Sequence, residues 1–215
     1  IPEGETNPLF IQDYSWSEDH KKLLIFTNTR RVWRYHTRGD YWVLDMATSR
    51  LLQLGADLPE VSLMFAKFSP PSDGLMSDRV AYVSEHNLYV ENLTSGEITQ
   101  LTQDGTEDII NGTFDWAYEE EFGARDGFRW SPDGQQIAYW QLDASNIRDF
   151  LMLNTTDSIY SYTIPVQYPK VGQDNSAAKI GVVSADGGET TWMQVSGDPK
   201  NNYLPSLLWS PDASG

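Results

Sequence analysis

The sequence predicts an all-β fold: part of a β-propeller, with roughly three to four four-stranded blades and a short helical insertion near residues 115–124. Two observations support this. A strand–turn–strand pattern recurs along the chain, and each copy follows an opening made of an aromatic residue, a serine and a turn rich in Pro, Asp and Gly. A β-sandwich is the alternative, because repeat period and turn chemistry do not separate the two architectures.

The strand–turn–strand units align on one another. Residues 40–54 (DYWVLDMATSRLLQL) align without a gap on residues 87–101 (NLYVENLTSGEITQL), at an offset of 47 residues. Residues 181–193 (GVVSADGGETTWM) follow the same scheme more loosely. In the second copy Gly96 lies in the turn, where a β-hairpin needs a residue able to take a positive φ. Each copy is therefore expected to form a β-hairpin.

The openings begin at four aromatic residues: Trp16, Phe68, Trp130 and Trp209. Their intervals of 52, 62 and 79 residues suit four-stranded blades separated by variable insertions. The last opening, WSPDASG at residues 209–215, stops within its turn. We therefore expect residues 1–215 to be an incomplete propeller domain.

Composition excludes several classes of function. The chain has 15 Lys and Arg against 31 Asp and Glu, a net charge of −16, which disfavours binding to nucleic acid. It has no cysteine, and its three histidines form no HExxH motif, so no metal site and no cofactor is expected. The apolar runs are too short for a membrane span, and the N-terminal IPEGETNPLF does not resemble a signal peptide.

Three consecutive glutamates, Glu119 to Glu121, stand between Tyr118 and Phe122. In a strand, neighbouring side chains point to opposite faces, whereas in a helical turn they lie about 100° apart and can converge. The segment WAYEEEFGA contains helix formers and ends in glycine, which predicts a short helix. Two converging carboxylates, Glu120 and Glu121, would bind a cation such as a protonated peptide α-amine. Tyr118 and Phe122 would hold this turn on the blade, and Glu119 would turn elsewhere.

Other interpretations of the triplet stay open at this point. In one interpretation the glutamates form a solvated acidic run, and in another they pair with nearby Arg125 and Arg129. A Ca²⁺ site formed by Asp115, Glu119 and Glu120 has weaker support, since no D-x-D-x-D-G loop is present. Residues 147–153 are the only other segment with a briefly helical pattern.

Residues 108–143 (DIINGTFDWAYEEEFGARDGFRWSPDGQQIAYWQLD) closely resemble the propeller domain of the dipeptidyl peptidase IV family, where a DWVYEEE-type stretch leads to a WSPxG turn. Residues 32–45 (VWRYHTRGDYWVLD) and 166–183 (VQYPKVGQDNSAAKIGVV) resemble two further segments of that family, in the same order. The resemblance covers most of the chain. It identifies the chain as a fragment of the N-terminal propeller of a prolyl oligopeptidase-type serine exopeptidase.

The resemblance also implies residue roles. Glu120 and Glu121 would bind the free N-terminus of a peptide substrate, and Arg34 would orient the carbonyl nearest the amine. The alternative for Arg34 is a structural salt bridge to a neighbouring blade. With the amine fixed, the distance to a serine nucleophile would set the bond that is cut, releasing dipeptides or, in a relative, tripeptides, with a post-proline preference.

The catalytic residues themselves are missing from this chain. No G-x-S-x-G motif occurs, and Ser131 and Ser210, both in WSPD turns, are interpreted as turn residues that make local backbone hydrogen bonds. The fragment is therefore expected to be non-catalytic, with the α/β-hydrolase domain elsewhere on the same polypeptide. The alternative is a non-enzymatic propeller that serves as a binding or scaffold module.

The resemblance implies the remaining partners and the location. A homodimer of the full-length enzyme is expected, although the segment before YPK is compressed relative to the mammalian pattern, which weakens the transfer of dimer contacts. The absence of cysteine departs from the animal enzymes and favours a bacterial, periplasmic or secreted protein.

Overall fold

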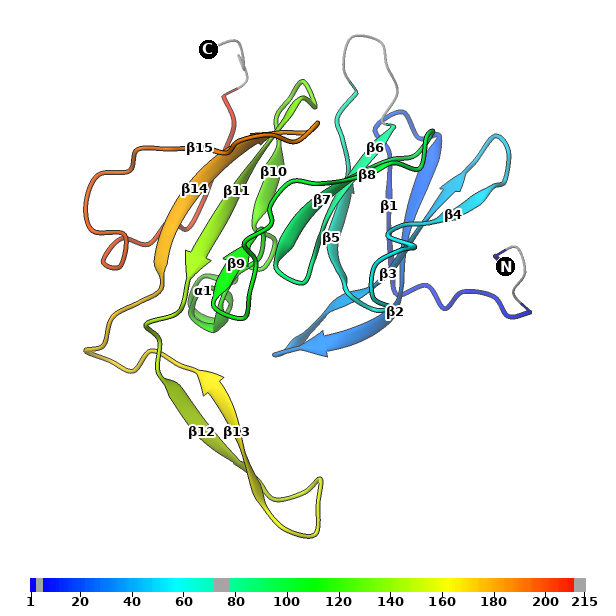
Figure 1. Cartoon of the computed structure of the whole chain (residues 1–215). Helices are drawn as coiled ribbons and strands as arrows, with labels where there is room; N and C mark the ends of the chain where they lie inside the picture. The colour runs from blue at the N-terminus through cyan, green and yellow to red at the C-terminus, as the bar shows by residue number, and fades with distance from the viewer. Residues whose placement is uncertain (3–5, 72–77, 211–215) are drawn as a thin grey trace.

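The computed structural model describes residues 1–2, 6–71 and 78–210. Within them the strands form two large sheets and a separate two-stranded hairpin (Figure 1). The first unit contains β1 (Asp13–Trp16), β2 (Lys22–Val32), β3 (Tyr35–Asp45) and β4 (Leu51–Gln53). The second contains β5 (Leu63–Phe68), β6 (Arg79–Ser84), β7 (Asn87–Asn92) and β8 (Ile98–Gln100). All neighbouring strands within these units pair antiparallel.

The first and second units join into one 8-stranded sheet. The connection is a short antiparallel pairing of β3 with β5, where Arg38 lies opposite Met64 and Gly39 opposite Leu63. The remaining length of β3 pairs with β4 on the same edge. A buried cluster packs the two units together: Leu24, Phe26, Tyr41, Val43, Leu54, Leu63, Val80 and Tyr82.

The third unit contains β9 (Ile109–Asn111), β10 (Phe128–Trp130), β11 (Gln136–Asp143), β14 (Ala177–Ser184) and β15 (Thr191–Trp192). β9 and β10 both pair with β11, but with different parts of it. The two short strands thus share one partner, and the chain between them leaves the sheet to form α1 (Trp116–Phe122). The helical insertion therefore lies between β9 and β10, the two short strands that pair with β11.

A buried cluster joins the second and third units, which stand side by side in Figure 1. Its members come from β5, β6, β7 and Leu101 on one side and from β10, β11, β14 and Ala185 on the other. They include the fully buried Val83, Leu88, Phe128 and Ile137. A third cluster, including Phe114, Tyr118 and Trp140, lies under α1. The core therefore fills the seams between blades and supports the helical insertion.

The structure confirms the expected hairpins. The three predicted repeats are the β3–β4, β7–β8 and β14–β15 hairpins, and the openings at Trp16, Phe68 and Trp130 end β1, β5 and β10 ahead of their partner strands. Part of the Phe68 opening lies outside the described residues, as does most of the turn after Trp209. The helix near residues 115–124 is also confirmed.

The expectation of a helical segment at residues 147–153 is wrong. This stretch enters β12 (Asp149–Asn154), which pairs antiparallel with β13 (Tyr162–Gln167) over six residue pairs. Cross-strand hydrogen bonds satisfy the backbone groups of this segment, whereas an isolated helix of this length would be only marginally stable. The hairpin extends from the body of the molecule as an arm (Figure 1).

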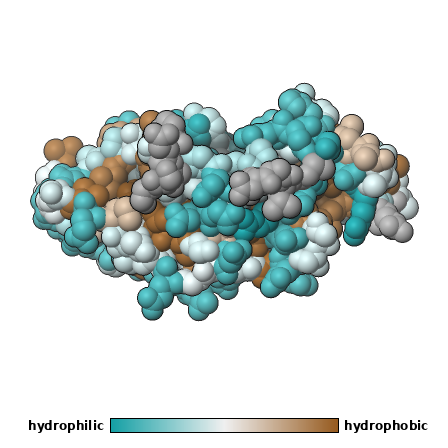
Figure 2. All heavy atoms as spheres, turned by 90° about the horizontal axis from the view of Figure 1, so that it is seen from above, coloured by the Kyte–Doolittle hydropathy of each residue, from teal (hydrophilic) through white to brown (hydrophobic). Residues whose placement is uncertain are grey.

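The surface fits the strongly acidic composition. Hydrophilic side chains cover much of the face seen from above, with apolar patches between them (Figure 2). Among the described residues, no helix has the length and apolar character needed to cross a membrane.

Candidate functional site

The helical insertion begins and ends at two glycines that touch. Gly127 N donates to Gly112 O at 2.9 Å, while Gly112 N donates to Trp140 O at 2.9 Å and Trp140 N to Gly127 O at 3.0 Å. Gly112 has a φ of +72°, and a Cβ on Gly127 would lie 2.7 Å from the carbonyl carbon of Gly112. Backbone conformation and close contact together require glycine at this neck.

Asp115 starts α1 and ties it to the sheet. Its Oδ1 accepts a hydrogen bond from Tyr118 N at 2.9 Å, as an N-cap residue does, and its Oδ2 accepts one from Ser176 Oγ at 2.6 Å. Gly123, with a φ of +64°, ends the helix in the left-handed conformation. These local signals explain why the helix is limited to seven residues.

Tyr118 and Phe122 hold the helix against the blade, as expected. Tyr118 is fully buried, its ring centroid lies 5.3 Å from that of Phe114, and its hydroxyl accepts a hydrogen bond from Leu204 N at 3.1 Å. Phe122 is partly exposed and packs on Tyr203 with ring centroids 4.8 Å apart. The aromatic residues on either side of the glutamates are therefore structural.

Arg34 and Glu120, two of the predicted site residues, are in contact although they are 86 positions apart. Arg34 Nε lies 2.6 Å from Glu120 Oε1 and 2.7 Å from Oε2. Arg34 lies in the turn between β2 and β3, so this ion pair joins the first unit to the insertion of the third. The Glu120 carboxylate raises the pKa of Arg34 by hydrogen bonding and by its charge.

This contact is also what the structural alternative for Arg34 describes, a salt bridge between blades. The Arg34 side chain is nevertheless 68% exposed, whereas that of Glu120 is 16% exposed. Only the Nε of Arg34 has a hydrogen-bond partner among the described residues, so the two terminal nitrogens face solvent unpaired. The ion pair orients the guanidinium and leaves its donor groups available.

The two other glutamates of the triplet have opposite environments. Glu121 is exposed and its side chain makes no hydrogen bond or ion pair within the part of the chain that the structure describes. Glu119 is only 7% exposed, and its Oε1 is buried without a hydrogen-bond partner. Burial raises the pKa of Glu119, a shift that the charge of Arg125 opposes and that of Glu120 adds to.

The structure gives little support to the alternatives in which the glutamates pair with Arg125 and Arg129 or bind Ca²⁺. Arg125 lies over the ring of Tyr35, 4.1 Å from its centroid, and Arg129 pairs with Asp126 at 3.3 Å. Neither forms an ion pair with the glutamates in the described structure. Both oxygens of Asp115 are already engaged, and the described residues contain no cluster of three or more His, Asp or Glu side chains placed to hold a metal ion.

Lys67 anchors the far end of the insertion. Its Nζ lies 2.6 Å and 2.7 Å from the two carboxylate oxygens of Asp126 and 2.9 Å from Phe128 O. A register shift between Met64 and Lys67 in the β5–β6 pairing places this side chain toward the third unit. Burial lowers the pKa of Lys67 to about 8, although the Asp126 carboxylate opposes the shift.

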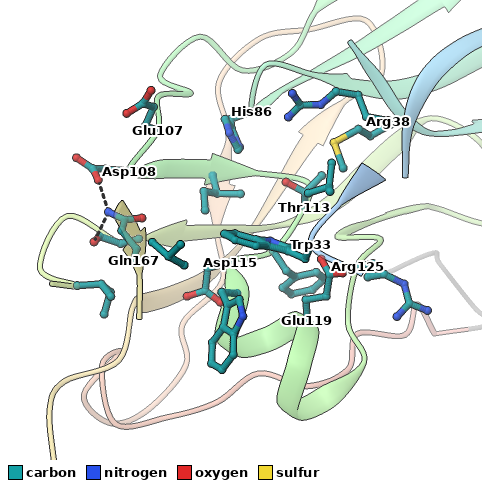
Figure 3. Close-up of a pocket in the computed structure, with 18 of the residues that line it drawn as sticks. Trp33, Arg38, His86, Glu107, Asp108, Thr113, Asp115, Glu119, Arg125 and Gln167 are labelled. Atoms are coloured by element: carbon teal, nitrogen blue, oxygen red, sulfur yellow. Dashed lines mark hydrogen bonds between the residues drawn. The ribbon is translucent and has the colours of Figure 1, made fainter. Parts of the chain in front are cut away.

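A cavity of about 560 Å³ adjoins α1. Figure 3 shows Glu119 projecting from α1 into it beside Trp33, with His86 and Arg38 farther away and Gln167 at the side. Burial and the charge of Arg38 lower the pKa of His86. Sequence reasoning missed this cavity. The signal that could have pointed to it is the spacing of Asp115, at the N-cap of α1, and Glu119, four residues later in the helix.

Ser131 is a turn residue, as predicted. Its Oγ accepts a hydrogen bond from Gln136 N at 2.9 Å and donates one to Asp133 Oδ1 at 2.5 Å. Ser210 is exposed, and the rest of its turn lies outside the described residues.

The protein-family model described as the dipeptidyl peptidase IV (DPP IV) N-terminal region matches residues 17–214 of this chain. The chain belongs to this family. Dipeptidyl aminopeptidase B of Saccharomyces cerevisiae is 33% identical over 201 residues, and the match covers 91% of this chain and 23% of the yeast protein. The probable dipeptidyl-aminopeptidase B of Talaromyces marneffei is 31% identical over 208 residues, and the match covers 90% of this chain and 23% of that protein.

The crystal structure of Porphyromonas gingivalis dipeptidyl peptidase 4 matches with a TM-score of 0.83 and 26% identity, covering 94% of this chain and 28% of that one. The chain is thus part of the propeller of a DPP IV family protein, and the β-sandwich alternative is wrong. The relatives include fungal and bacterial proteins. The chain spans about a quarter of their length.

Proposed function

We propose that this chain is the substrate-gating, N-terminus-recognising propeller portion of a serine exopeptidase that releases dipeptides from peptide N-termini. The activity belongs to the complete polypeptide, with a C-terminal α/β-hydrolase domain supplying the nucleophile. The contact between Arg34 and Glu120 is the observation that favours this function, because it brings together two residues predicted to bind the same substrate.

The anchor for the substrate amine is the pair Glu120 and Glu121. A free peptide α-amine has a pKa of about 7.7 to 8.0 and, when protonated, offers three hydrogen-bond donors. Glu120 is held by Arg34, and Glu121 is exposed on the next position of the same helix. Charge-assisted hydrogen bonds to two carboxylates would fix the amine more strongly than neutral ones.

Arg34 completes the recognition of the first residue. While its Nε holds Glu120, its terminal nitrogens are free to donate to the carbonyl oxygen next to the substrate amine. A planar guanidinium can hold the glutamate and donate to the carbonyl at the same time, because its N–H groups point in different directions in one plane, whereas an ammonium group concentrates its donors on one nitrogen. The insertion then acts as a ruler: with the amine fixed, the position of the serine selects the bond that is cut.

The hydrolase domain would determine whether dipeptides or tripeptides are released and whether proline is preferred beside the cut bond. The test is to incubate the complete polypeptide with peptides of sequence Ala-Pro-X and their N-acetylated forms and to identify the products by mass spectrometry. Release of Ala-Pro from unblocked peptides alone supports the function. Cleavage of neither form favours the alternative of a propeller that acts as a binding or scaffold module. Cleavage of both forms would contradict recognition of the free N-terminus.

The arm formed by β12 and β13 supports a homodimer of the full-length enzyme. Phe150, Leu151, Met152 and Leu153 are all exposed, so apolar side chains lie on both faces of this hairpin. Exposed apolar surface of this extent is typical of protein–protein contacts. We propose a bacterial protein, because its cysteine-free sequence departs from the animal enzymes of the family, and a location in the periplasm or outside the cell.

A further inference from the structure

The cavity beside α1 adjoins the predicted amine site. Trp33 and Glu119 line it, and they immediately precede Arg34 and Glu120 in the chain. The side chains that bind the α-amine and those that line the cavity therefore alternate along the same two segments, the β2–β3 turn and α1. The charge of Glu120 also acts on Glu119, so a side chain attached to the carbon that bears the amine would reach from Glu120 toward Glu119.

Glu119 is kept in the cavity at an energetic cost. It is 7% exposed, and its Oε1 has no hydrogen-bond partner among the described residues. A buried carboxylate without a partner is one of the less favourable arrangements in a folded protein. Figure 3 shows the side chain directed into the cavity, so the missing partner would be a group that enters it.

The lining favours a cation over an anion. Five acidic residues contribute to it: Glu107, Asp108, Asp115, Glu119 and Asp149. Two arginines oppose them. Arg38 stands near His86, away from Glu119 (Figure 3), whereas Arg125 lies over the ring of Tyr35 and its charge also acts on Glu119. Trp33 and Trp116 add aromatic faces, which attract ammonium and guanidinium groups.

We propose that this cavity is a second cation subsite, which binds the positively charged side chain of a lysine or arginine at the N-terminus of the peptide substrate, with Glu119 as its counter-charge. The inference rests on the proposed function, since it places the α-amine on Glu120 and Glu121. It adds that the propeller selects the first residue of the substrate by charge.

The test compares Lys-Pro-p-nitroanilide with norleucine-Pro-p-nitroanilide, which has a side chain of similar length without the ammonium group. In the complete polypeptide we expect kcat/KM to favour the lysine substrate about tenfold or more, from one charge-assisted contact. Glu119→Gln, an isosteric change, should bring the ratio close to one. Asp149→Asn, at the exposed rim of the cavity, should lower it by a smaller factor.

Two further variants separate this inference from the proposed function. Glu120→Gln should lower kcat/KM for both substrates and keep their ratio, and no effect on either would contradict the amine anchor alone. Glu97→Gln, exposed in the β7–β8 turn, serves as the matched control and should change neither value. If the polypeptide cleaves neither substrate, the same ratio is read from the Kd values of Lys-Pro-amide and norleucine-Pro-amide by calorimetry.

A ratio near one in the wild-type protein would overturn the subsite. So would a ratio that Glu119→Gln leaves unchanged, or a preference for Glu-Pro-p-nitroanilide over the norleucine substrate, which would assign the cavity to Arg38 and Arg125 instead.

Discussion

Glu119 combines burial with a missing hydrogen-bond partner, and its pKa is raised because burial disfavours the charged form. The folded state therefore holds this proton more tightly than the unfolded chain does. Stability from this source is complete below the unfolded pKa and is lost as pH rises through the folded pKa. As pH rises, the folded protein must therefore ionise a buried carboxyl group whose Oε1 has no hydrogen-bond partner among the described residues.

Glu119→Gln should consequently stabilise the protein at pH 8 and have little effect at pH 4. An unsatisfied buried group costs about 1 to 3 kcal/mol, and a gain of about 1 kcal/mol raises Tm by roughly 2 to 4 °C in a domain of this size. Thermal unfolding at pH 4, 6 and 8 measures the trend, with Glu97→Gln as the exposed control. A lower Tm at pH 8 would show that the carboxylate has a partner.

Arg34 is expected to matter less than the glutamates, since it orients a neutral carbonyl. Arg34→Lys keeps the positive charge but loses the planar donor group, so kcat/KM for an unblocked substrate should fall about three- to tenfold. The losses for Glu120→Gln and Glu121→Gln should each be larger. If the lysine variant is affected as strongly as either glutamine variant, the anchors have been ranked in the wrong order.

At the scale of single residues, the sequence and the family resemblance identified Arg34 and Glu120, which the structure brings together. The cavity that Glu119 faces escaped prediction because its lining comes from residues that lie far apart in the chain, such as Trp33, His86 and Gln167. Lys67 escaped for the same reason: its direction follows from an irregularity in the β5–β6 register that no local pattern encodes.

Among the elements, the helical insertion depends on its glycine neck. Gly112 has a φ of +72°, and an added Cβ would lie 2.8 Å from Val83 Cγ2, whereas Gly96 has a φ of +74° with no atom within 4 Å. Gly96→Ala should cost about 1 to 2 kcal/mol for the left-handed backbone alone. Gly112→Ala should cost about 1 to 3 kcal/mol more, because the same strain is joined by a steric clash.

Chemical denaturation of the two variants measures this difference, and kcat/KM for an unblocked substrate shows whether the insertion has also moved. Equal losses of stability in both variants would mean that the sheet accommodates a methyl group at the neck and that the glycine is needed only for its backbone conformation.

The hairpins were predictable because their turn residues have local preferences, as at Gly96 and in the WSPD turns. The short helix was predictable from its helix formers, with Asp115 and Gly123 at its two ends. The strand β12 was missed because its pairing with β13 is set by partners eight or more residues away, and tertiary pairing overrides weak local preference.

For the whole molecule, the arm formed by β12 and β13 is the proposed contact of the homodimer. Leu151 and Leu153 lie on one face of the arm, 61% and 65% exposed. Replacing both by aspartate should convert the dimer of the complete polypeptide to a monomer, because charge would be buried in an apolar contact. Sedimentation velocity measures the change, and Leu208→Asp, 91% exposed on another part of the chain, is the control. A dimer that survives the double substitution would move the interface elsewhere.

The central claim is that Glu120 and Glu121 bind the substrate amine, and the most direct test uses the complete polypeptide. The measurement is the ratio of kcat/KM for Ala-Pro-p-nitroanilide to that for its N-acetyl form, in the wild-type protein and in the Glu120→Gln and Glu121→Gln variants. We predict that the wild-type ratio is large and that each variant lowers it by roughly ten to a thousandfold, equivalent to about 1.4 to 4 kcal/mol of lost charge-assisted bonding. A ratio that both variants leave unchanged would contradict the claim.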